Sequence, residues 1–284
     1  MQNKKFILNA DDFGMSHAHN TAVKEGFKEG VLKSTSLVAN GEAFDEARKI
    51  CLSCPELGVG VHLNIIEGKS LTRKLEMLTD INGNFNKSYL ELIINSYKPN
   101  NRLFMEELEQ EFRAQIELVK NSGINITHID SHVHTHAIPP IFELVCRLAK
   151  EYGIKQVRTQ HENFYMIPDV YIHLKKTYLL NIIKVLLLNI FTKKNKQFSR
   201  INGLKTNDYL IGVGYTSMMN NLTVLYGLAS LRKKENITVE VLIHPCRYDE
   251  GFIDNHFNEY CITKSKNLKE KIEKIGYEIT NYLF

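Results

Sequence analysis

The stretch FILNADDFG, residues 6–14, runs from apolar residues into two adjacent aspartates. A short apolar run of this kind is typical of a buried β-strand. The same order, an apolar run followed by polar side chains and then by a helical pattern, recurs along the chain. We therefore take residues 6–10 as the first of several strands that alternate with helices.

Seven segments have the composition of strands: residues 6–10, 34–39, 58–64, 125–130, 155–158, 209–213 and 238–244. Helical patterns lie at residues 19–29, 44–51, 105–121, 139–152, 178–191 and 265–275. Such alternation predicts a parallel sheet. No GxGxxG follows the first strand and no P-loop exists, so an open nucleotide-binding sheet loses support. We predict an α/β fold, a TIM-like distorted (β/α) barrel of about seven parallel strands.

The chain's 284 residues contain no internal repeat or low-complexity linker, which predicts a single barrel domain over residues 1–284. The net charge of +4 comes from interspersed signs, so no footprint for nucleic acid is present. Five cysteines, an odd number at irregular spacing, predict reduced thiols and a cytoplasmic location.

The most apolar stretch is residues 178–191, YLLNIIKVLLLNIF. It contains two asparagines and a lysine, and it is shorter than the roughly 20 residues that a membrane span needs. The amino-terminal residues MQNKKFILNADD do not form a signal peptide. We predict no membrane span and a helix that is buried or partly exposed. A membrane-surface contact or a homodimer contact is the alternative for this helix.

Polar side chains gather where the predicted strands end. They are Asp11 and Asp12, His62 and Asn64, Asp130 and His132, Arg158, and His244. In an α/β barrel the carboxyl ends of the strands form one face, and that face carries the active site. We therefore expect these side chains to lie close together.

Asp12, His62 and His132 form a candidate metal site, because two imidazoles and a carboxylate can hold a divalent ion and leave positions open. Asp11 is placed to take a proton from water, and His244 could protonate a leaving group. Three alternatives stay open. The aspartates could cap the next helix, His62 could be structural, and the alternating histidines of residues 132–136 could be a surface tract.

Five segments carry a resemblance to a known family: NADDFGMS at residues 9–16, GVHLN at 60–64, THIDSHVHTH at 127–136, VR at 157–158 and IHP at 243–245. In these motifs and their order the sequence resembles the YdjC-like carbohydrate deacetylases, which include chitooligosaccharide deacetylases. The resemblance extends from residue 5 to about residue 280.

The resemblance implies a distorted barrel and removal of the N-acetyl group from an amino sugar or short oligosaccharide, which releases acetate (EC 3.5.1.-). The family's metal ligands fall on Asp12, His62 and His132, its general base on Asp11, and its general acid or the helper of that acid on His244. The implied substrate contacts are Arg158, His134, His136 and Asn64, with Arg158 also able to orient the base. The implied cofactor is one divalent ion. The two imidazoles favour zinc, whereas the family is usually described with magnesium, which prefers oxygen ligands.

Two other functions remain as alternatives. A metal-dependent phosphoesterase on a barrel would be expected to have a second metal site and basic phosphate clamps. A non-catalytic sugar-binding protein would need exposed aromatic side chains, and the chain has 13 Tyr but no Trp.

Overall fold

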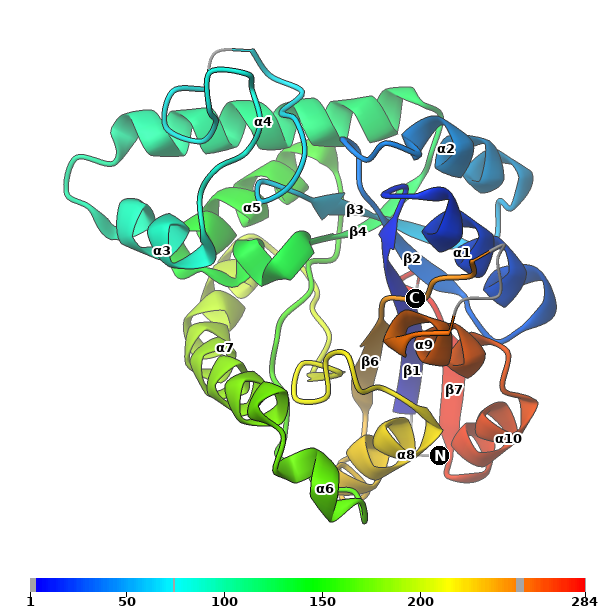
Figure 1. Ribbon diagram of the computed structural model, residues 1–284. Helices are drawn as coiled ribbons and strands as arrows, with labels where there is room; N and C mark the ends of the chain where they lie inside the picture. Colours follow the sequence, from blue (N-terminus) through cyan, green and yellow to red (C-terminus); the bar gives the residue numbers. More distant parts are fainter. Residues whose placement is uncertain (1–3, 74, 249–252, 284) are drawn as a thin grey trace.

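A computed structural model describes residues 4–73, 75–248 and 253–283 as a curled parallel sheet surrounded by helices (Figure 1). The strands lie in the order β4-β3-β2-β1-β6-β5, and β7 also pairs with β1. The strands are β1 (Lys4–Phe13), β2 (Ser34–Leu37), β3 (Gly58–Leu63), β4 (Ile126–Ser131), β5 (Tyr209–Ile211), β6 (Ile237–Ile243) and β7 (Tyr277–Thr280). The predicted α/β distorted barrel is confirmed.

The barrel is irregular between β4 and β5, where two isolated parallel bridges span the gap. One joins Ile129 to Val157 and the other joins Gln156 to Lys205. The prediction of a full strand at residues 155–158 was therefore wrong. Just beyond this segment the N–H of Thr159 donates to the side chain of Asn207 at 2.7 Å. This N–H is therefore not available for the backbone hydrogen bond that would extend the strand. The seventh strand is instead β7, which the sequence did not predict.

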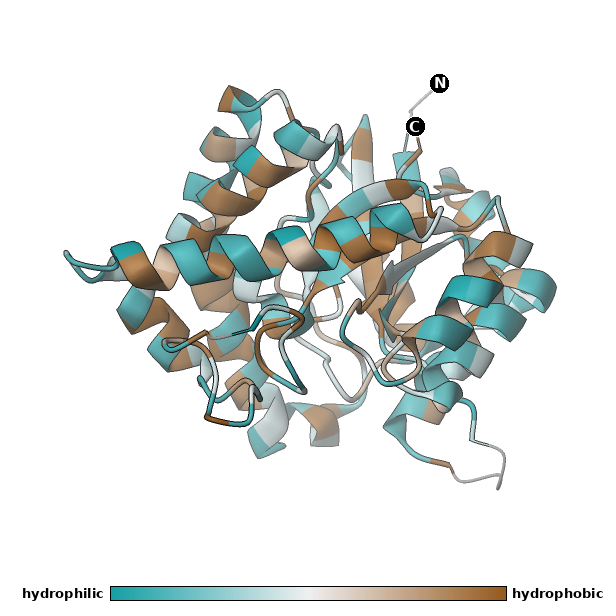
Figure 2. Ribbon diagram, turned by 90° about the horizontal axis from the view of Figure 1, so that it is seen from above, coloured by the Kyte–Doolittle hydropathy of each residue, from teal (hydrophilic) through white to brown (hydrophobic). Residues whose placement is uncertain are grey.

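The helices are α1 (His17–Glu29), α2 (Phe44–Ser53), α3 (Tyr89–Tyr97), α4 (Arg102–Asn121), α5 (Pro139–Tyr152), α6 (Val170–His173), α7 (Lys176–Ile201), α8 (Asn221–Ser230), α9 (Asn255–Thr263) and α10 (Lys266–Lys274), with the 3-10 helix η1 (His132–Ala137). Seen from above, α4 crosses the front of the molecule with hydrophobic and hydrophilic residues interleaved (Figure 2). Its buried residues include Phe104, Leu108, Phe112 and Ile116, one face of a helix. None of the described helices has the length and hydrophobicity to cross a membrane.

The inside of the barrel is polar. Buried side chains there include Asn9 and Asp11 from β1, Asp130 from β4 and Glu240 from β6, and they alternate along the strands with apolar residues of the core. Gly60 of β3 makes room for this filling, because a Cβ at that position would lie 2.4 Å from Nε2 of His128. The polar filling places titratable groups inside the barrel, and two of them, Asp11 and Asp130, lie near the carboxyl ends of their strands.

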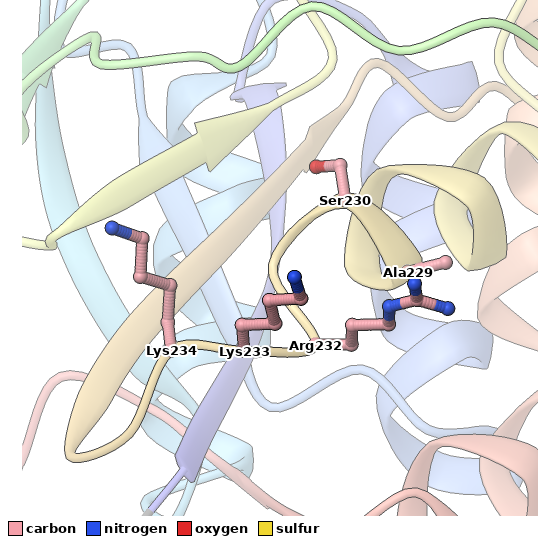
Figure 3. Close-up of a pocket in the computed structure, with 5 residues that line it drawn as sticks. All are labelled: Ala229, Ser230, Arg232, Lys233 and Lys234. Atoms are coloured by element: carbon pink, nitrogen blue, oxygen red, sulfur yellow. The ribbon is translucent and has the colours of Figure 1, made fainter.

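A hollow of about 500 Å³ lies beyond the end of α8 and is lined by Ala229, Ser230, Arg232, Lys233 and Lys234 (Figure 3). Lys234 comes shortly before Ile237, where β6 begins. The hollow therefore lies at the amino ends of the strands. The polar side chains that follow the strands lie at the opposite ends, so the hollow is separate from the candidate active site.

Candidate active site

Asp11 and Asp12 are neighbours in sequence but face different surroundings. The pairing register of β1 with β2 shifts between Ala10 and Phe13, and Asp12 has a φ of 63°. This left-handed backbone conformation is uncommon for a residue other than glycine. It directs the carboxylate of Asp12 toward His62 and His132, while that of Asp11 faces Arg158.

The carboxylate of Asp12 lies between two histidines. Nδ1 of His132 donates to Asp12 Oδ1 at 2.8 Å, and Nε2 of His62 lies 3.3 Å from the same oxygen. The donor atoms of the three residues lie within 4.8 Å of one another. Burial alone would raise the pKa of Asp12, but hydrogen bonds with His132 and His62 hold that pKa well below its usual value. The structure thus brings together the three side chains that the sequence proposed as metal ligands.

His62 is held from behind by Asp130. Nδ1 of His62 donates to Asp130 Oδ1 at 2.8 Å, and the other oxygen of Asp130 accepts from Ser36 Oγ at 2.7 Å. A carboxylate behind a histidine fixes the ring and turns Nε2 toward the position of the ion, as is usual for histidines that bind metals. One oxygen and two imidazole nitrogens fit a divalent transition ion. The donor set is therefore suitable for such an ion.

Arg158 lies at the centre of a second, fully buried cluster. Its Nη1 and Nη2 donate to the two oxygens of Asp11 at 2.7 and 2.6 Å, its Nη2 lies 2.6 Å from Asp130 Oδ2, and its Nε donates to Glu240 Oε1 at 2.8 Å. Burial would lower the pKa of Arg158, but the three carboxylates raise it well above its usual value. Asp11, His62 and Asp130 also lie close enough to share an ion. Arg158 already occupies that space, so the set around Asp12 is the better candidate.

His244 follows β6 and is paired with Glu259 of α9. Nδ1 of His244 lies 3.5 Å from Glu259 Oε2, and the backbone N–H of His244 donates to the same oxygen at 2.5 Å. Burial would lower the pKa of His244, but the hydrogen bond and charge of Glu259 raise it to about 9. His244 is therefore protonated near neutral pH and can donate a proton.

The other predicted side chains differ in their accessibility. His134 is half-buried with a φ of 58°, and its Nδ1 has no hydrogen-bond partner among the described residues. His136 is fully buried, its Nδ1 bonded to Ser131 Oγ at 2.5 Å and its Nε2 to the side chain of Gln160 at 2.8 Å. Asn64 is also buried, and its Oδ1 accepts from the N–H groups of Ile66 and Glu67. His136 and Asn64 are thus engaged in holding the loops around the site.

Sequence reasoning did not assign roles to Asp130, Glu240 or Glu259. Asp130 stands at a strand end between two histidines, so its position was a usable signal. Glu240 interrupts the apolar run ITVEVLI of β6, and an acid in such a strand signals a buried partner. Glu259 lies in α9, a helix that the sequence analysis missed, and nothing nearby marks it.

Comparisons with known proteins find one matching family model and several relatives. The model of the family described as YdjC-like protein matches residues 5–274. A relative named carbohydrate deacetylase 1, from Listeria innocua serovar 6a, is 43% identical over 98% of both chains. The carbohydrate deacetylase of Clostridium beijerinckii is 40% identical over 53% of this chain, a match that spans 58% of that relative's length.

Two solved structures share the fold. One is a protein of Enterococcus faecalis V583 with a suggested role in cellobiose-phosphate cleavage. It has a TM-score of 0.74 and 26% identity, over 99% of this chain and 98% of that one. The other is an uncharacterized protein of Agrobacterium tumefaciens C58, with a TM-score of 0.52 and 8% identity over 99% of this chain and 88% of that one.

Proposed function

The chain belongs to the YdjC-like family, and on that premise we propose that it is a metal-dependent carbohydrate deacetylase. The reaction is hydrolysis of the N-acetyl group of an amino sugar or short chitooligosaccharide-type substrate, an amide hydrolysis of class EC 3.5.1.-. The observation that carries the proposal is the divergence of Asp11 and Asp12, which puts a fixed carboxylate beside a set of three possible metal ligands. The whole chain, residues 1–284, would act as one catalytic domain.

Asp12, His62 and His132 would hold the ion. When bound, a divalent ion would polarise the acetyl oxygen and lower the pKa of a water at the site. The two imidazoles favour zinc, while magnesium remains the alternative that the family suggests. The bond between His62 and Asp130 supports the assignment, because it presents Nε2 of His62 toward Asp12.

Asp11 would act as the general base. The forked pair with Arg158 and a 2.7 Å hydrogen bond from Asn9 fix both of its oxygens. Asp11 takes a proton from water as the water oxygen forms a bond to the acetyl carbon. Because the guanidinium is bonded to carboxylates on both sides, Arg158 is better suited to holding Asp11 than to contacting the sugar.

His244 would act as the general acid. As the bond between the acetyl carbon and the sugar nitrogen breaks, protonated His244 gives its proton to that nitrogen, and the products are acetate and a free amine. The pairing with Glu259 supports this role, because it keeps the imidazole charged near neutral pH. His134 remains a proposed contact to the sugar.

The location is a further proposal. All five cysteines are free, which supports a cytoplasmic location. From the sequence, residues 178–191 offered a homodimer contact or a membrane-surface contact as alternatives.

The test is acetate release. The protein is stripped of metal, reloaded separately with zinc, magnesium, cobalt or manganese, and given N-acetylglucosamine or its short β-linked oligomers. We expect acetate with at least one ion and none from Asp11→Asn with the same ion bound. Release of phosphate from phosphomonoesters, with no acetate under any condition, would favour the phosphoesterase. Sugar binding without turnover would favour the binding protein.

A further inference from the structure

Exposed apolar side chains concentrate on one segment of the chain. Within residues 164–190 the large apolar side chains that are exposed to solvent are Phe164, Met166, Val170, Tyr171, Leu174, Leu179, Leu180, Ile183, Leu186 and Ile190. They belong to the segment before α6, to α6, to α7 and, for Leu174, to the short link between the two helices. Scattered exposed apolar residues are normal, but a contiguous group usually marks an interaction site.

The two faces of α7 are inverted relative to a helix that faces water. Its buried residues are Tyr178, Asn181, Val185, Leu188, Thr192, Asn195 and Ser199, most of them polar. Leu179, Ile183, Leu186 and Ile190 fall on the opposite side at spacings of four, three and four residues, which is one stripe of a helix. Ile183 is 62% exposed and Ile190 is 64% exposed. The more apolar side of the helix thus faces outward.

Hydrogen bonds fix this orientation. The side chain of Asn181 donates to the carbonyl of Thr216 at 3.1 Å, and that of Asn195 donates to the carbonyl of Ala137 at 2.7 Å. Asn189 donates to the carbonyl of Glu162 and accepts from its N–H, both at 2.9 Å. Rotating α7 to bury the apolar stripe would break these bonds, so the fold holds the stripe in its outward orientation.

The charges of α7 indicate what covers the stripe. The helix carries Lys176, Lys184, Lys193, Lys194, Lys196 and Arg200 and no acidic residue. Lysines therefore flank the stripe at both ends. A twofold copy of this chain docked on the stripe, parallel or antiparallel, would place lysine ends beside lysine ends, and like charges repel. A surface of negative charge would instead be complementary at both ends.

We propose that α6 and α7 dock in the plane of an anionic phospholipid membrane. The stripe would enter the boundary between headgroups and acyl chains, and the lysines would lie against the headgroups. Tyr171, which is 82% exposed, and Phe164 have the amphipathic and aromatic character found at membrane interfaces. Figure 1 shows α7 at the edge of the molecule. On its inner side the same helix holds the end of η1 through Asn195. The inference does not rest on the proposed deacetylase activity.

The test is co-sedimentation of the full chain with vesicles. We expect binding to vesicles of phosphatidylglycerol and phosphatidylcholine that weakens as salt is raised, and at least tenfold weaker binding to phosphatidylcholine alone. The double variant Ile183→Ser/Leu186→Ser should lose at least tenfold in binding to the anionic vesicles. Lys193→Gln/Lys194→Gln should lose binding and part of the salt dependence.

A matched control is Leu90→Ser on α3, a leucine that is 64% exposed on another element. It should bind vesicles as the unmodified protein does, and the unfolding temperatures of all variants should agree. Absence of binding to anionic vesicles would overturn the proposal. A dimer in sedimentation equilibrium that Ile183→Ser/Leu186→Ser converts to a monomer, without vesicle binding, would assign the stripe to a second copy instead.

Discussion

Asp11 and Asp12 occupy adjacent positions, yet one lies in a closed cluster and the other in an open one. Around Asp11, a guanidinium and the amide of Asn9 engage both oxygens, and the residue is 2% exposed. Around Asp12, two ring nitrogens converge on one oxygen, and His132 is partly exposed. The closed cluster fixes a position, while the open cluster has donor atoms that an ion can share. The left-handed backbone at Asp12 is what separates the two.

Changing each aspartate alone should give the largest effects and tests whether the two carboxylates have different roles. Asp11→Asn should keep the bound ion and lower kcat by about 10²–10⁴-fold, the usual contribution of a general base. Asp12→Ala should lose both the ion and the activity, because it removes the only oxygen of the proposed donor set. Metal content after dialysis and acetate release measure the two effects. Equal ion loss in both variants would contradict the division between the clusters.

The closed cluster should carry the larger share of stability. Arg158→Met leaves Asp11, Asp130 and Glu240 buried without their cation, so we expect the free energy of unfolding to fall by about 3–5 kcal/mol. Urea denaturation measures this change. His132→Ala, in the open cluster, is the comparison and should cost clearly less. A small effect of Arg158→Met would show that water or protonation compensates the carboxylates.

Asp130 contacts both clusters, so changing it tests whether the closed cluster supports ion binding in the open one. Its Oδ1 holds His62 and its Oδ2 faces Arg158 and Ser36. Asp130→Asn keeps the shape but weakens the support of His62, so ion affinity should fall by about 10–100-fold. Titration with a chelator as competitor measures the affinity. Ser36→Ala removes only the hydroxyl contact and should have a smaller effect.

The pH dependence of activity tests the proposed role of His244 as the general acid. His244 donates only when protonated, so with its pKa at about 9 activity should be lost as the pH rises through that value. Because this folded-state pKa is raised above the ordinary one, the associated stability is present below pH 6.5 and is lost as the pH rises through about 9. Glu259→Gln removes the partner that raises the pKa, so the alkaline limb should move to lower pH. An unchanged limb would assign it to another group.

The open cluster was easier to predict from sequence than the closed one. Asp12, His62 and His132 each come at or just past a strand end, and parallel strands bring those ends to one face. Arg158 was also placed at a strand end, although the strand proved to be only isolated bridges. Its partners Asp11 and Asp130 also come at strand ends, so their approach to Arg158 could be expected in the same way. Its third partner could not. Glu240 lies inside a strand, and Tyr282, which bonds to Glu240, follows the last strand, so their meeting depends on how the barrel closes. The outward apolar stripe of α7 likewise depends on hydrogen bonds that no helical pattern shows.

The smallest expected effect concerns Tyr282, which supports Glu240 of the closed cluster. The ring of Tyr282 stacks on His128, with centroids 4.0 Å apart, and its hydroxyl donates to Glu240 Oε2. Tyr277 is also buried, but its hydroxyl has no hydrogen-bond partner among the described residues. Tyr282→Phe should therefore lower the free energy of unfolding by about 1.5–3 kcal/mol, the range for a hydrogen bond to a charged group. Tyr277→Phe should leave it nearly unchanged. If Glu240 also holds Arg158 in place for Asp11, Tyr282→Phe should lower kcat while KM and ion content stay constant. A loss of stability without a change in kcat would show that the closed cluster fixes Asp11 without help from Tyr282.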